Sequence, residues 1–98
     1  MPNGVTSIGR EAFYRCSSLT SLMLGRSLKS IGDRAFYDCS SLTNITIPDR
    51  VTSIGRSVFA FCTNLKQIYC IVESEPMGWN VEWKDNCSAT VVWGYTDK

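Results

Sequence analysis

The sequence predicts an α/β repeat solenoid, a stack of short coils that each supply parallel strands and one helical or 3₁₀ turn. Two observations support this fold class. One block of residues occurs three times in succession, at a constant interval and without insertion or deletion. Each block also closes on apolar residues that alternate with other side chains, as in a strand. Because one coil cannot bury its own apolar side chains, the copies must stack to be stable.

The repeat is clearest where each copy begins. Val5–Gly9 recurs as Leu28–Gly32 and as Val51–Gly55, which defines a 23-residue period. The period then fails after Cys70, where the chain continues without a fourth matching copy. We therefore divide the chain into a repeat region 1–72, with repeats 5–27, 28–50 and 51–72, and a C-terminal segment 73–98 that we call the tail.

Each coil should contain two short strands on opposite walls. Leu22 and Leu24 alternate with Met23, so the two leucines point inward and Met23 outward. Pro48 ends the equivalent strand of the second coil, because proline has no amide hydrogen to donate. The segment Val5–Ile8 and its copies should form the second strand, and strands of successive coils should pair in parallel.

The segment between these strands has helical spacing. Ala12–Phe13 is followed three residues later by Cys16, which predicts a single helical or 3₁₀ turn. Gly9 and its copies are expected at the preceding turn, in a left-handed or cramped conformation. Identical side chains at equal intervals should then form two internal columns, made of Phe13, Phe36 and Phe59 and of Cys16, Cys39 and Cys62.

The tail holds all three tryptophans of the chain. Trp79 and Trp83 are four residues apart, which places them on one face of a helical turn. Thr90–Trp93 is predicted to be a final strand. We interpret Trp79, Trp83 and Trp93 as an aromatic cap over the last coil, since large aromatic side chains cover apolar area efficiently. The alternative is an aromatic platform for a sugar or a peptide.

Five cysteines and no histidine limit the chemistry of the chain. Thiolates at identical positions of successive coils would point in parallel, which does not suit tetrahedral metal binding. Parallel Cβ vectors also do not suit disulfides along the column. Reduced, buried thiols are therefore expected there, and a bridge between Cys70 and Cys87 is left open.

Composition excludes several classes of function. Without histidine, Ser-His and Cys-His catalysis cannot occur, and no cofactor motif is present. We therefore predict that the protein is not an enzyme and binds no cofactor or metal. The net charge is +1, too close to neutral to drive binding to nucleic acid or to an anionic membrane. The short apolar stretches also argue against membrane insertion.

The repeats resemble the BspA-like, or Treponema-type, leucine-rich-repeat family. The closing L-x-x-L-x-L is a strand signature of leucine-rich repeats. The resemblance lies in S-I-G-R-E-A-F-Y-R-C-S-S-L-T-S at 7–21, in S-I-G-D-R-A-F-Y-D-C-S-S-L-T-N-I-T-I-P at 30–48 and in S-I-G-R-S-V-F-A-F-C-T-N-L at 53–65. It implies a non-enzymatic solenoid for adhesion and protein recognition, at a bacterial or protozoan surface or secreted, with a host extracellular protein as one kind of partner.

The chain is shorter than is typical of that family, and its first residues are not a secretion signal. Pro2–Val5 aligns with Pro48–Val51, so the sequence begins inside a repeat. We therefore expect a piece of a longer, surface-exposed or secreted array. The alternative is a short protein whose open N-terminal coil pairs with another copy, which would make it a self-assembly module.

Binding is expected on the outer face of the strands that close each repeat. Residues that point outward from these strands are mostly neutral and polar, with three apolar members. Such a sheet face is the usual recognition surface of a solenoid. The candidate residues are Ser21, Met23, Asn44, Thr46, Gln67, Tyr69 and Ile71.

Overall fold

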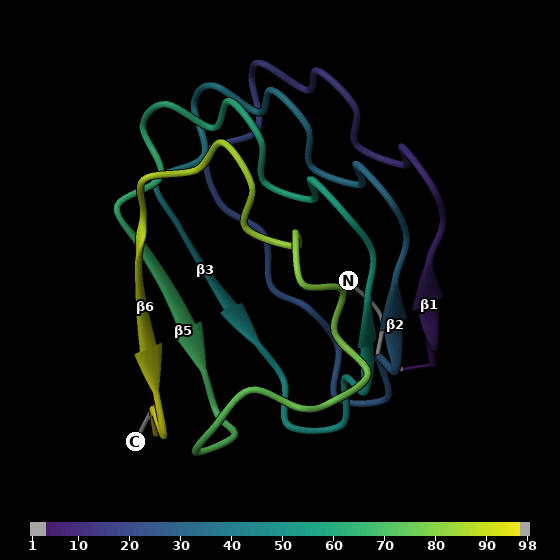
Figure 1. Ribbon diagram of the computed structural model, residues 1–98. Coiled ribbons are helices and arrows are strands. Elements are labelled where there is room, and N and C mark those ends of the chain that lie inside the picture. Colours follow the sequence, from purple (N-terminus) through teal and green to yellow (C-terminus); the bar gives the residue numbers. More distant parts are fainter. Residues whose placement is uncertain (1–3, 97–98) are drawn as a thin grey trace.

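The computed structural model describes residues 4–96. It is a stack of coils with two parallel sheets on opposite walls (Figure 1). The alignment of Pro2–Val5 with the second repeat falls mainly on residues 1–3, outside the described residues. One wall contains the two-residue strands β1 (Ser7–Ile8), β2 (Ser30–Ile31) and β4 (Ser53–Ile54). The other contains the four-residue strands β3 (Asn44–Ile47), β5 (Gln67–Cys70) and β6 (Thr90–Trp93).

The register of both sheets follows the period of the sequence. Ser7 pairs with Ser30, which pairs with Ser53. On the other wall β3 pairs with β5 and β5 with β6, each time in a register of one period. The predicted stack of coils with parallel strands is therefore confirmed. In the first coil, however, the predicted strand around Leu22 and Leu24 is reduced to one bridge between Met23 and Thr46.

The predicted helical or 3₁₀ turns are wrong, because residues 4–96 contain no helical segment. Residues 10–15 form a series of tight turns instead. The Phe13 amide donates to Ala35 of the next coil (2.8 Å), while the Cys16 amide donates back to Phe13 (3.2 Å). A helix would use both amides internally. Here every second amide donates a hydrogen bond to a carbonyl of the next coil. The chain therefore turns through left-handed residues such as Glu11 (φ 58°) and Arg15 (φ 57°).

The glycines that precede these turns are cramped in the inner coils and are not left-handed. A Cβ on Gly55 would lie 2.6 Å from the Asp33 amide nitrogen, and one on Gly32 would lie 2.6 Å from the Arg10 nitrogen. Gly9 has nothing within 4 Å. Glycine is thus required where a coil lies directly against the preceding one. The left-handed glycine of the described chain is Gly94 (φ 70°).

The interior consists of side-chain columns that run along the stack. The ring centroids of Phe13 and Phe36 are 5.2 Å apart, and those of Phe36 and Phe59 are 5.5 Å apart, in nearly parallel planes. Trp83 extends this column edge-on from Phe59 (6.2 Å, 77°). Phe36 and Phe59 are fully buried, and Phe13 is half-buried in the first coil.

The cysteine column satisfies backbone carbonyl groups. The Cys39 thiol donates to the Phe13 carbonyl oxygen (3.1 Å), and the Cys62 thiol donates to that of Phe36 (3.0 Å). All five cysteines are free, so the bridge between Cys70 and Cys87 that the sequence left open is not formed. Cys70 lies in β5 opposite Trp93, whereas Cys87 lies against the outer segment of the stack.

The tail winds into a fourth coil. β6 follows β5 at the normal interval, and it is the final strand predicted from the sequence. The outer segment departs from the period. In the second coil the Asp38 amide donates to the carbonyl of Ala60, 22 residues later. The equivalent Phe61 amide would donate to Trp83 at that interval, but it donates to the carbonyl of Asn86 (3.0 Å). Trp79 and Trp83 contact each other edge-on (5.0 Å, 75°), but they lie outside any helix, so the predicted helical turn is also wrong here.

Candidate functional site: a groove on the strand face

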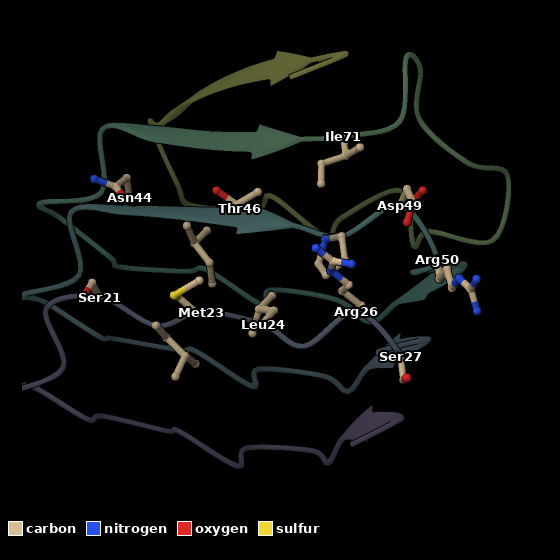
Figure 2. Close-up of a pocket in the computed structure, with 13 residues that line it drawn as sticks. Ser21, Met23, Leu24, Arg26, Ser27, Asn44, Thr46, Asp49, Arg50 and Ile71 are labelled. Carbon is tan, nitrogen blue, oxygen red and sulfur yellow. The ribbon is translucent and has the colours of Figure 1, made fainter. Parts of the chain in front are cut away.

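A groove with a cavity volume of about 890 Å³ crosses the outer face of the first two coils and reaches Ile71 of the third. Its floor is the L-x-x-L-x-L segment of the first coil together with β3 (Figure 2). This volume lies within the usual range of ligand pockets, about 300–1,000 Å³. The lining comprises Ser21, Leu22, Met23, Leu24, Arg26, Ser27, Asn44, Ile45, Thr46, Pro48, Asp49, Arg50 and Ile71.

Five of the seven residues predicted for the binding face line this groove: Ser21, Met23, Asn44, Thr46 and Ile71. They come from three coils, with Met23 and Thr46 paired across the sheet. Met23 is the most prominent, because 82% of its surface is exposed in the first coil, at the edge of this wall, where it pairs with Thr46. An exposed, flexible thioether adapts well to different apolar partners.

Gln67 and Tyr69 do not line the groove. The ring of Tyr69 packs against that of Tyr95, with centroids 4.4 Å apart. Tyr95 is held there because its amide donates to the Cys70 carbonyl (3.0 Å), after the chain turns through Gly94. The end of the tail therefore covers part of the third and fourth coils, and the open part of the face is its N-terminal half.

Sequence reasoning missed the charged end of the groove. Arg26 and Arg50 lie with Asp49 just after the strand positions of the first and second coils (Figure 2). All three are exposed, and none takes part in the ion pairs that residues 4–96 form. Charged residues at the turn after each closing strand were the available signal, because the ends of parallel strands meet at one edge of a sheet.

A second feature that the sequence analysis missed is an aromatic row on the outer turns. Tyr14 stacks on Tyr37 (5.0 Å), which contacts Phe61 edge-on (5.4 Å). Tyr14 and Phe61 are 40% and 46% exposed. Ion pairs between coils flank this row, such as Arg15 with Asp38 (3.6 Å). The row is built from contacts between coils, which gives it a structural role.

The tryptophans of the tail lie inside the fourth coil. Trp79 and Trp83 are 3% and 4% exposed. The indole nitrogen of Trp79 donates to the Val51 carbonyl (3.0 Å), and that of Trp83 donates to the Glu75 carboxylate (3.1 Å). Trp93 is half-buried and tilts against Trp79 (5.7 Å). Their burial supports the cap interpretation over an aromatic platform.

Two thiols of the interior, those of Cys62 and Cys70, are kept protonated by their surroundings. Burial raises the pKa of Cys70 to about 12, with a smaller contribution from the Glu75 carboxylate. The pKa of Cys62 is raised by its hydrogen bond with Cys39 and by burial. No group of three metal-ligating side chains occurs within the described ranges. In that same part of the chain, no helix has the length and apolar character needed to cross a membrane.

Comparison with known proteins agrees with this architecture. Residues 1–81 match the model of a family described as BspA type leucine rich repeat region (6 copies). Among solved structures, the leucine-rich repeat protein of T. pallidum (TpLRR) is similar, with a TM-score of 0.69 and 35% sequence identity. The similarity covers 70% of this chain but 32% of that protein. No curated protein matches the sequence.

Proposed function

The chain belongs to the BspA-type leucine-rich repeat family, and from this membership and the groove we propose that it is a non-enzymatic protein-recognition module. The observation that carries the proposal is Met23, an apolar side chain that is 82% exposed and lines a groove of about 890 Å³. Met23 lines the groove together with Leu24 and Ile71, among polar residues, and exposed apolar surface rimmed by polar residues is typical of protein-interaction sites. The family is composed of repeats that generally mediate protein interactions, which supports the same conclusion.

Selection of binding peptides from a displayed library on the immobilised chain tests this proposal. We expect Met23→Asp to weaken the binding of the selected peptides at least tenfold, because the introduced carboxylate would have to lose its water under the apolar contact. Met77→Asp is the matched control, since Met77 is fully exposed in the tail, outside the groove. Equal losses in the two variants, or none in either, would argue against the groove as the binding site.

The wider role that we propose is adhesion. The parent protein would present the module at a cell surface or outside the cell, where a host extracellular protein is one kind of partner. The support is family membership. Protease treatment of intact source cells, followed by detection of the module with an antibody, tests this: loss of the module supports surface exposure, and full protection contradicts it.

Self-assembly through the first coil is a second candidate function. Phe13, Cys16 and Leu19 are half-buried, whereas their equivalents in the second coil are fully buried. Stacking of another coil on this end would bury them. The molar mass from light scattering at high concentration tests this candidate. A dimer that Leu19→Asp dissociates would support it, and a monomer at all concentrations would rule it out.

A further inference from the structure

The charge of the groove indicates what kind of protein segment it binds. Two guanidinium groups, of Arg26 and Arg50, and one carboxylate, of Asp49, lie at the same end of it. None of them is in an ion pair within residues 4–96. Three arginines of the outer turns, Arg15, Arg34 and Arg56, behave differently, since each pairs with a carboxylate of a neighbouring coil, as Arg56 does with Glu82 at 3.0 Å. The groove therefore keeps positive charge that is available to a ligand.

Apolar and polar contacts lie at fixed distances from this charge. Met23 is three residues before Arg26 along the first coil, which corresponds to about 10 Å for an extended chain. Leu24 and Ile71 also line the groove, as half-buried apolar side chains. At the other end Ser21 offers a hydroxyl group. From Ser21 to Arg26 the groove spans about 16 Å, the length of roughly five extended residues.

We infer that the groove binds an acidic, extended protein segment of about five residues. An apolar side chain of the segment packs on Met23, and a carboxylate three residues farther along binds Arg26, while Arg50 adds positive charge at the same end of the groove. Charge-assisted hydrogen bonds from guanidinium groups to a carboxylate are stronger than neutral ones. This inference rests on the proposed recognition function and adds the chemistry of the partner, since Asp49 balances only one of the two arginines.

Titration of the ¹⁵N-labelled chain with two short peptides tests the inference. The peptides are blocked at both ends and have the sequences Ser-Leu-Ser-Thr-Asp and Ser-Leu-Ser-Thr-Asn, which differ only in the charge of the last residue. We expect the acidic peptide to bind about tenfold more tightly at low salt. Amide signals of Met23, Arg26 and Thr46 should move most. The difference should shrink as salt is added, because the arginines are exposed.

Variants locate the effect. The double substitution Arg26→Gln with Arg50→Gln should bring the two affinities together. Arg10→Gln is the control, because Arg10 is an exposed arginine outside the groove, and it should preserve the difference. Equal affinities of the two peptides for the unmodified chain would overturn the acidic-segment inference and leave the recognition face in place. Signal changes outside the groove, or none, would overturn both.

Discussion

Removing one ring from the phenylalanine column tests whether the coils stabilise each other. Phe36 is fully buried and stacks on two neighbours, at 5.2 and 5.5 Å. Phe36→Ala should lower the free energy of unfolding by about 3–5 kcal/mol, since it creates a cavity and removes two aromatic contacts. A domain of this length has a total stability of about 5–15 kcal/mol. The change would therefore remove a large part of it.

Phe13→Ala is the matched control, because Phe13 is half-buried and has one neighbour in the column. Its loss should be about 1–2 kcal/mol, as expected for partial burial of a phenylalanine. Urea denaturation followed by circular dichroism gives both values, and the slope reports whether the stack unfolds in one step. Tryptophan fluorescence follows the fourth coil separately. If the two variants lose the same stability, the columns do not couple neighbouring coils and the reasoning fails.

Three further predictions concern the backbone, the tail and a buried thiol. Gly55→Ala should lower the melting temperature clearly, because its Cβ would lie 2.6 Å from the Asp33 nitrogen. Gly9→Ala should change the melting temperature little, because no atom lies within 4 Å of that position. Equal effects would contradict the close packing of coils. Trp79→Phe should cost about 1–2 kcal/mol in urea denaturation, because the Val51 carbonyl loses its donor, and it should leave peptide affinity unchanged; weaker binding at unchanged stability would favour the aromatic platform. Stability should fall as the pH rises from about 9 towards 12, because Cys70 remains protonated in the folded chain but ionises in the unfolded one. The stability of the Cys70→Val variant should fall less steeply over the same pH range.

The period alone was sufficient to predict the stack and its columns. Identical side chains one period apart occupy equivalent positions, so Phe13, Phe36 and Phe59 had to lie above one another once the coils stacked. The outer face of the strands was also predictable, because alternation along Leu22, Met23 and Leu24 decides which side chain points outward. These features depend on local spacing repeated along the chain, which a single sequence contains.

Other features depend on contacts between distant segments, and only the tertiary structure decided them. The helical spacing of Ala12, Phe13 and Cys16 was misleading, because amides of that segment bond to the next coil and the chain turns instead. The tail became a fourth coil although its outer segment is out of period. Tyr95 covers Tyr69 for the same reason, through a hydrogen bond to β5. The repeated sequence therefore determines the structure of each coil, while contacts between coils determine which part of the surface stays exposed.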